Sequence, residues 1–520
     1  MKIILITCSA ILLTVSAWAQ KKTYSLDFNA AKYDKQTLEY NGKKISVRAY
    51  ENIVYVANPI DTTYQVMNIY VPEAFFKNKE VHGYNAATAP IFFPNQVGGY
   101  MPAKPASTKN TGFSGPPANG IPPQGMPGGM PQGEQPKGDR PQGGGPNDPG
   151  KKENTVVAAL AQGYVVASAG ARGRTNKDAD GLFYGKAPAA IVDLKAAVRY
   201  LKFNDKAIPG DANKIISNGT SAGGAMSALL GATGDNADYL PYLKALGAAN
   251  TSDAVFASSD YCPITNLDNA DAAYEWQFNE INTYKKGGFG PQASAAAKTL
   301  TDAQIKVSDD LKTLFPSYVN SLQLKDSKEN TLHLDKEGNG SFKDYIKDVV
   351  IASANKAQKQ GTDLSVHKWL TIKNGVVTAL DWDGYITYME RQKTPPAFDA
   401  LDLTSGENNE FGTETIDNQH FTDYGVQHSS VAGTTKADSH IVKMMNPMNY
   451  IGAQGTKTAK YWRIRHGSKD KDTGLAVSAI LALYLQNHGA SVDYALPWDK
   501  PHSGDYDLDE LFVWINSIAK

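Results

Sequence analysis

This 520-residue chain has few cysteines, no large excess of charge of one sign and few long apolar runs. Its two cysteines, Cys8 and Cys262, exclude a fold built on a network of disulfide bonds. Its 52 basic and 53 acidic side chains leave a net charge of −1, whereas a nucleic-acid-binding face needs a clear basic excess. Beyond the N-terminus no run approaches about 18 apolar residues, so we expect no transmembrane helix. The nine histidines do not recur at metal-ligand spacing, and we expect neither a metal nor a cofactor.

The first nineteen residues have the features of a signal peptide. Lys2 supplies the positive end, residues 3–15 form the apolar segment, and residues 17–19 are an A-x-A cleavage pattern. We therefore expect a mature chain that begins at Gln20 and is exported to the periplasm or secreted, with Cys262 as its single thiol.

Proline and glycine are concentrated in one segment. Residues 101–150 contain twelve prolines and twelve glycines, and glycine does not recur at every third position as in collagen. Such a composition lacks the apolar periodicity needed to offset the entropy of ordering. We predict a mobile loop at about residues 103–151, within one domain because both flanks continue one sheet pattern.

Strand and helix patterns alternate on either side of that loop. Asn41-Gly42 predicts a hairpin between residues 37–40 and 43–47. Apolar runs and helical periodicity predict further strands and helices, which are strands at 53–56, 65–71, 90–94, 164–168, 214–218, 461–465 and 491–496, and helices at 188–201, 475–487 and 507–518. The spacing of Asp507 and Glu510 predicts a capping box at the last helix. The alternation predicts an α/β fold, with a mostly parallel sheet and helices on both faces.

The residues between the two β/α blocks differ from both. Residues 264–447 are polar, helix-rich and less regular, with a hairpin signal at Asn374-Gly375. We predict a lid domain there, inserted between a first core part at 20–263 and a second at 448–520.

Residues 219–223 read Gly-Thr-Ser-Ala-Gly, a G-x-S-x-G motif between a buried strand and a helix made of small residues. In this motif a tight strand-to-helix turn exposes the serine, and small neighbours avoid clashes. A plain glycine-rich turn is the alternative, but the strand and helix on either side favour a nucleophile at Ser221.

A serine nucleophile needs a base and an acid that orients the base. His488 ends a helix beside Gly489, where a capping role suffices, whereas His502 follows the last strand. Loops after strands build the site in such sheets, so we predict His502 as the base. By pattern alone Asp470 and Asp472, which follow the preceding strand, are both candidates for the acid.

The oxyanion hole would use two backbone N–H groups. One belongs to Ala222, directly after the nucleophile, and the other comes from a loop after an early strand. Gly98 and Gly99 occupy that second position, where an ordinary turn is the alternative.

Several long segments of the chain resemble the bacterial tannases, within the tannase and feruloyl esterase group of α/β-hydrolases. The segments cover nearly the whole mature chain: PNQVGGYMP at 94–102, GARGR at 170–174, GKAPAAIVDLKAAVRYL at 185–201, SNGTSAGGAMSALLGATGDN at 217–236, DYCPITNLDNADAAYEWQF at 260–278, 462–466, and ALPWDKPHSGDYDLDELF at 495–512. The export signal and the Gly/Pro-rich segment depart from the family pattern.

The resemblance implies an α/β-hydrolase fold with Ser221 as nucleophile, Asp470 as acid and His502 as base. It also implies that Lys393, Glu407 and Asp472 bind the hydroxyls of a galloyl ring. Composition and periodicity give no reason to separate these three from ordinary surface charges.

We therefore expect an exported serine esterase that hydrolyses galloyl esters and depsides and releases gallic acid. Its partners would be small galloyl or other aromatic esters, with no nucleic acid and no membrane span. A feruloyl or general aryl carboxylesterase with the same triad is the nearest alternative. A prolyl-peptidase-like enzyme would usually add a propeller, and no such repeat occurs. A non-catalytic binding protein would not need the intact Ser, Asp and His.

Overall fold

The computed structural model describes residues 23–109, 153–285 and 296–520. The predicted signal peptide and most of the predicted loop at 103–151 therefore lie outside the described residues. The start of that loop is described and packs on the sheet. Ala103 pairs with Ala171 in an isolated bridge, and the N–H of Ala106 donates to Ser168 Oγ at 2.9 Å. Ala103 and Ala106 are buried, so the chain leaves the sheet later than the predicted start of the loop at about residue 103. The mobility predicted for the segment stays a prediction.

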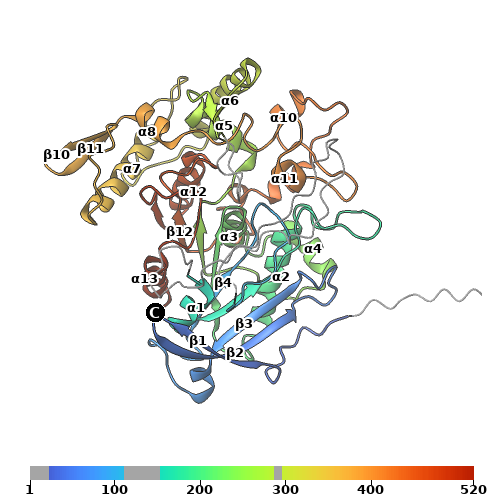
Figure 1. The fold of residues 1–520 in the computed structure, drawn as a ribbon. Coiled ribbons are helices and arrows are strands. Elements are labelled where there is room, and N and C mark those ends of the chain that lie inside the picture. Colours follow the sequence, from blue (N-terminus) through green and yellow to red (C-terminus); the bar gives the residue numbers. More distant parts are fainter. Residues whose placement is uncertain (1–22, 110–152, 286–295) are drawn as a thin grey trace, which may run out of the picture.

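A nine-stranded sheet forms the centre of the described structure, in the order β1-β2-β3-β5-β4-β6-β7-β12-β13 (Figure 1). Its first three strands are antiparallel to their neighbours, and the strands from β5 to β13 pair in parallel. The strands are β1 (Asp34–Tyr40), β2 (Lys43–Val54), β3 (Val66–Pro72), β4 (Pro90–Pro94), β5 (Val165–Ala169), β6 (Asp211–Thr220), β7 (Ala257–Tyr261), β12 (Tyr461–Arg465) and β13 (Ser491–Ala495). The predicted α/β fold with a mostly parallel sheet is confirmed.

Local signals account for the edges of this sheet. At the predicted hairpin Tyr40 pairs with Lys43, and Asn41 and Gly42 both have positive φ, at 48° and 73°. Asparagine and glycine tolerate this left-handed backbone better than other residues, which is why this dipeptide forms two-residue hairpin turns.

The core helices bury small and aliphatic residues against the parallel strands. Helices α1 and α13 pack together, and so do helices α2 and α3. The ring of Tyr164, just after α1, lies 5.8 Å from that of Phe512 on α13. The core helices are α1 (Thr155–Ala161), α2 (Ala189–Phe203), α3 (Ala222–Ala232), η2 (Ala237–Tyr239), α4 (Leu240–Ala245), α12 (Leu475–Asn487) and α13 (Leu508–Ala519), with η1 (Glu73–Lys77) beside β3.

The predicted capping box of α13 is wrong. Asp507 makes no side-chain cap, because its carboxylate accepts hydrogen bonds from Arg463 Nη2 at 2.5 Å and from the Tyr261 hydroxyl at 2.6 Å. Both carboxylate oxygens of Asp507 already have partners, Oδ2 in the buried Arg463 of strand β12 and Oδ1 in the Tyr261 hydroxyl, so neither is left for the helix N–H groups.

The segment between β7 and β12 is helix-rich and lies beyond one end of the sheet, at the top of Figure 1. Its elements are α5 (Leu267–Phe278), β8 (Thr283–Tyr284), β9 (Lys298–Thr299), α6 (Asp302–Ser321), α7 (Ser341–Lys359), β10 (Leu370–Lys373), β11 (Val376–Leu380), α8 (Trp382–Met389), α9 (Gly406–Glu410), α10 (Asp423–Gln427), α11 (Ser439–Met444) and η4 (Pro447–Asn449). The hairpin predicted at Asn374-Gly375 joins β10 to β11. The exact boundaries of a lid domain at 264 and 447 stay a prediction.

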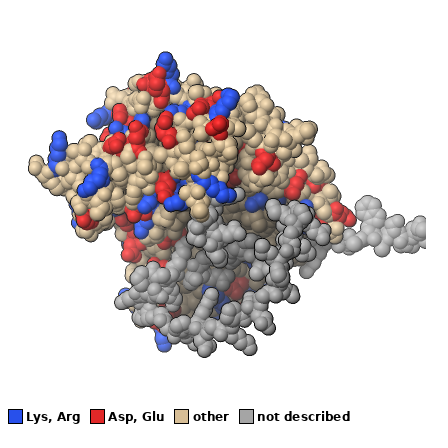
Figure 2. Space-filling view, turned by 45° about the horizontal axis from the view of Figure 1, so that its top comes forward, with Lys and Arg blue, Asp and Glu red and all other residues tan. Residues whose placement is uncertain are grey.

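The surface carries charges of both signs. On the face shown in Figure 2, basic and acidic side chains are interspersed over the upper part of the molecule without a large area of one sign. Within the described residues no helix is long and apolar enough to cross a bilayer.

Candidate active site

Ser221 occupies a strained turn between strand β6 and helix α3. Its backbone has φ 62° and ψ −124°, a region that residues with a Cβ rarely adopt. The flanking glycines permit this turn. A Cβ on Gly219 would clash with the carbonyl of Gly223, and a Cβ on Gly223 would lie 2.6 Å from Val97 O. The G-x-S-x-G pattern therefore has a steric cause here, and it presents Ser221 at the carboxyl end of β6.

The neighbouring parallel strands bring the acid and base candidates to the same edge of the sheet. Asp470 follows β12 and His502 follows β13, and Asp470 Oδ2 lies 2.7 Å from His502 Nδ1. Asp470 Oδ1 accepts the backbone N–H of Asp472 at 2.9 Å, which fixes the orientation of the carboxylate. Asp470 is fully buried and His502 is 20% exposed. Of the two aspartates left open by pattern, Asp470 contacts the histidine nitrogen that an orienting acid must reach.

The electrostatics of this pair favour charge on both partners. Burial alone would raise the pKa of Asp470, but the charge and hydrogen bond of His502 are the main opposing causes, and that pKa falls to about 2. Burial would lower the pKa of His502, and the Asp470 carboxylate outweighs it and raises that pKa well above its usual value. An imidazole held beside an ionised carboxylate is suited to accept a proton during a reaction.

Ser221 and His502 are not hydrogen-bonded to one another within the described residues. His502 Nε2 instead has Cys262 Sγ and Asp472 Oδ1 as neighbours, each at 3.9 Å. The Ser221 N–H donates to Tyr261 O at 3.0 Å, which fixes its backbone, and its hydroxyl has no hydrogen bond to any other described residue. Hydrogen bonds of this kind are often long before substrate is bound and shorten in the complex.

The residues predicted for the oxyanion hole have free donors. Within the described part of the chain the backbone N–H groups of Ala222, Gly98 and Gly99 have no hydrogen-bond acceptor. Ala222 is the first residue of α3, so the positive end of the helix dipole also faces this position. Gly99 has φ 54°, a left-handed turn for which glycine has no steric penalty.

Two of the three residues predicted to bind the ring lie together. Lys393 Nζ is 3.1 Å from Asp472 Oδ1, and Gln392 Nε2 donates to Asp472 Oδ2 at 2.8 Å. Glu407, on α9, makes no ion pair among the described residues, and its carboxylate is hydrogen-bonded to its own backbone N–H. Burial raises the pKa of Glu407, and the nearby positive charge of Lys393 opposes that shift.

Sequence reasoning missed His466 and Gln392. His466 is fully buried, and its Nε2 lies 3.2 Å from Asp470 Oδ2, the same oxygen that binds His502. Burial lowers the pKa of His466, which favours a neutral ring. Its place directly after the strand at 461–465 was a usable signal. Gln392, beside Lys393, had none.

One group of potential metal ligands occurs among the described residues. The ligand atoms of Cys262, Asp470 and His502 lie within 4.8 Å of one another. The aspartate and histidine atoms are already hydrogen-bonded to each other, so the triad interpretation explains this cluster without a metal.

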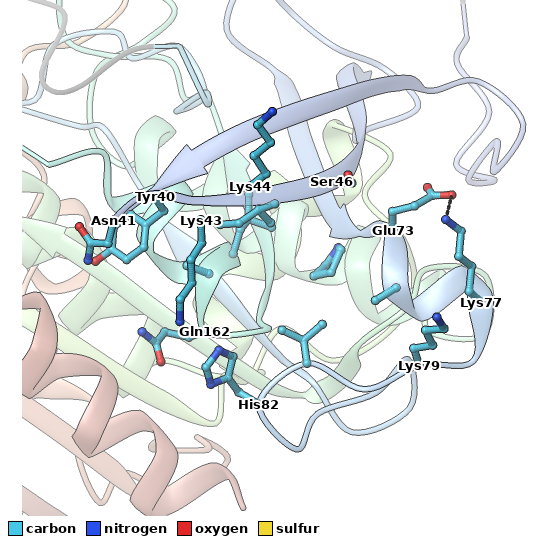
Figure 3. Close-up of a pocket in the computed structure, with 16 residues that line it drawn as sticks. Tyr40, Asn41, Lys43, Lys44, Ser46, Glu73, Lys77, Lys79, His82 and Gln162 are labelled. Atoms are coloured by element: carbon cyan, nitrogen blue, oxygen red, sulfur yellow. Dashed lines mark ion pairs between the residues drawn. The ribbon is translucent and has the colours of Figure 1, made fainter. Parts of the chain in front are cut away.

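A cavity of about 510 Å³ lies at the opposite, antiparallel edge of the sheet (Figure 3). Lys43 of β2 points toward His82 and Gln162 there, and Lys77 pairs with Glu73 at 3.9 Å. None of the candidate site residues lines this cavity, and we assign it no part in the chemistry of Ser221.

A strained serine after one parallel strand, with an acid and a histidine after two other parallel strands at the same edge, is the arrangement of the α/β-hydrolases. The fold is that of this class. Comparison with known proteins identifies the family.

The family model BD-FAE, a feruloyl esterase-like domain, matches residues 142–308. The tannase of Fusobacterium nucleatum is 49% identical, with 96% of this chain and 100% of that chain covered and a TM-score of 0.84. The native tannin acyl hydrolase of Lactobacillus plantarum is 42% identical over 95% and 99% of the two chains, with a TM-score of 0.84. A tannin acyl hydrolase in complex with ethyl gallate gives 42% identity, the same coverage and a TM-score of 0.83. A comparison with curated proteins finds no match. The chain belongs to the tannase family and is a carboxylic ester hydrolase.

Proposed function

We propose that this protein is an exported serine esterase that cleaves galloyl esters and depsides and releases gallic acid. The observation that carries the proposal is the Asp470–His502 pair beside the Ser221 elbow. It is supported by near-full-length similarity to tannases, one of which is in complex with ethyl gallate. The export part rests on the sequence of residues 1–19 alone.

The reaction would proceed through an acyl-enzyme. Ser221 Oγ attacks the ester carbonyl carbon while His502 Nε2 takes the hydroxyl proton. The carbonyl oxygen becomes an oxyanion, which accepts hydrogen bonds from the backbone N–H groups of Ala222 and of Gly98 or Gly99. His502 then gives the proton to the departing alcohol oxygen, and the galloyl group remains on Oγ. Water, deprotonated by His502, attacks that ester, and gallic acid leaves as Oγ regains the proton.

Ring recognition would use Lys393, Asp472 and Glu407. The ammonium of Lys393 donates, and the two carboxylates accept when ionised, so together they can bind adjacent ring hydroxyls of both roles. Lys393 and Asp472 are paired, each about one-fifth exposed, so the ring would insert beside a preformed ion pair. A substrate without the hydroxyls would leave these charged groups desolvated, a penalty of about 1–3 kcal/mol or more each.

Two measurements test the proposal. Ser221→Ala should reduce turnover on the order of 10⁶-fold while the fold is retained, and near-normal activity would refute the mechanism. Methyl gallate should have a kcat/KM far above that of methyl benzoate. Lys393→Ala should reduce that ratio with little change on a small nitrophenyl ester, and a ratio near one in the parent protein would refute galloyl recognition.

A feruloyl or general aryl esterase is the second candidate, favoured by the BD-FAE match. The same triad would serve it, and only the ring pocket differs. Ferulate carries one phenolic hydroxyl and a methoxy group, and it offers fewer donors to the two carboxylates. Preference for methyl ferulate over methyl gallate would support this candidate in place of the first.

A further inference from the structure

Arg174, in the loop after β5, touches two segments that meet at the candidate site. Its Nε donates to Gly99 O at 2.8 Å, and its backbone N–H donates to Tyr100 O at 2.9 Å. On its other side, Nη1 donates to Asn409 Oδ1 at 2.9 Å, on helix α9. One guanidinium therefore joins the loop that carries the oxyanion donors to the helix that carries Glu407.

The lid side of this contact is oriented by its surroundings. Asn409 is 7% exposed, and its Nδ2 donates to Asp417 Oδ1 at 2.5 Å and to Asn418 Oδ1 at 3.1 Å. These acceptors leave the amide oxygen to face Arg174. Lys186 Nζ also donates to Asn409 O at 2.7 Å, which holds the backbone of α9 against the core.

The core side is also fixed. Tyr100 is buried and has φ 57°, and its hydroxyl donates to Ile264 O at 3.3 Å. The N–H of Ile264 in turn donates to Ser221 O at 3.3 Å. The loop of residues 98–100 is thus connected to the nucleophile on one side and to Arg174 on the other.

The arginine also contacts α9 at its first turn. A Cβ on Gly406 would lie 3.3 Å from Arg174 Nη2, so the guanidinium rests on the backbone next to Glu407. A planar guanidinium has several donors in fixed directions and spans two acceptors at once, whereas a lysine ammonium is a single point on a flexible stem.

We propose that Arg174 is a positioning residue that couples the lid helix α9 to the oxyanion loop, so that ring binding and oxyanion stabilisation share one geometry. The inference rests on the proposed galloyl esterase function. Arg174 touches no reacting atom. It holds the peptide of Gly99 and the helix of Glu407 at a fixed separation, and a small displacement of either costs rate because oxyanion donors act over short distances.

The test is a double-mutant cycle between Arg174→Gln and Asn409→Ala, with kcat and KM measured on methyl gallate and on p-nitrophenyl acetate. Arg174→Gln should lower kcat about tenfold or more on both esters, because the oxyanion loop loses its anchor. Asn409→Ala should lower kcat/KM for methyl gallate and leave the nitrophenyl ester within about twofold. On methyl gallate the double variant should be less impaired than the product of the two single effects.

Controls separate this role from a general loss of structure. Lys177→Gln removes an exposed charge three residues along the same loop and should leave both activities unchanged. Arg174→Lys keeps the charge but cannot reach both acceptors, so it should restore little of the loss on methyl gallate. If Arg174→Gln misfolds, this variant and Asn409→Ala carry the test alone.

Three outcomes would overturn the inference. They are parental kinetics in Arg174→Gln, full rescue by lysine, and effects of the two variants that simply multiply on methyl gallate. If the parent protein cleaves p-nitrophenyl acetate but not methyl gallate, the proposed function fails instead, and the kcat of Arg174→Gln on the nitrophenyl ester still tests the oxyanion-loop anchor.

Discussion

Replacing Asp470 by asparagine tests the acid–base pair directly, because the structure determines how the new amide must sit. The backbone N–H groups of Asp472 and Thr473 point at Oδ1 of residue 470, at 2.9 and 3.4 Å. An asparagine would therefore place its carbonyl oxygen there and its NH₂ at the Oδ2 position, 2.7 Å from His502 Nδ1.

An amide donor at that position forces Nδ1 of His502 to accept, and the ring proton then sits on Nε2. This tautomer cannot take a proton from Ser221, so we expect Asp470→Asn to lower kcat about 10⁴-fold, as in other triads. That factor corresponds to about 5–6 kcal/mol of transition-state stabilisation. KM for methyl gallate should change little, because Asp470 is buried and Lys393 and Asp472 remain.

The assay is steady-state hydrolysis of methyl gallate, with circular dichroism as the check on folding. Asp499→Asn is the matched control, since Asp499 lies in the His502 loop but is exposed and touches Tyr388 and Lys469 instead. It should retain activity within about threefold, because exposed ion pairs contribute little. A folded Asp470→Asn variant with more than a tenth of parental kcat would refute the tautomer argument. Loss in Asp472→Asn on every ester would then assign the acid to Asp472.

Three further predictions concern pH and stability. The Asp470 carboxylate outweighs burial and raises the pKa of His502, and His502 must be neutral to act as a base. We therefore expect kcat/KM to rise with pH through a midpoint above about 6.5, the ordinary pKa of histidine. A midpoint below that value would contradict the pairing of His502 with Asp470. Gly223→Ala should lower the melting temperature, since its Cβ would lie 2.6 Å from Val97 O and overpacking costs on the order of 1–3 kcal/mol, and an unchanged melting curve would argue against the steric account. Asp253→Asn should lower the free energy of unfolding in urea by about 3–5 kcal/mol, because Lys195 and Arg199, each 2.7 Å from the carboxylate and under a tenth exposed, lose their partner. The control Asp310→Asn, whose partner Lys306 is exposed, should lower it by less than about 1 kcal/mol.

The local elements of this protein follow from local sequence. The bounds of β12 and α12 agree with those predicted, and most other predicted core strands and helices end within about three residues of their observed bounds. The strands predicted separately at 43–47 and 53–56 are wrong as separate elements, because one strand, β2, runs through residues 43–54. Turn chemistry at Asn41-Gly42 and the close approach of Gly219 to the carbonyl of Gly223 act over a few residues, so sequence alone specifies them. The same holds for the α/β alternation, which fixes the parallel sheet and hence the edge where Ser221 and His502 emerge.

Contacts between distant segments depended on the tertiary structure. Asp470 and Asp472 are two residues apart with the same side chain, and only the path of their loop turns one toward His502 and the other toward Lys393. The same reason explains why Asp507 pairs with Arg463 on β12 rather than capping its helix. Arg174 gives no local signal at all, because its partners Gly99 and Asn409 are 75 and 235 residues away along the chain. Sequence determined which elements form, and packing of those elements decided which polar side chains meet, since a hydrogen bond depends on position in space and not on separation along the chain.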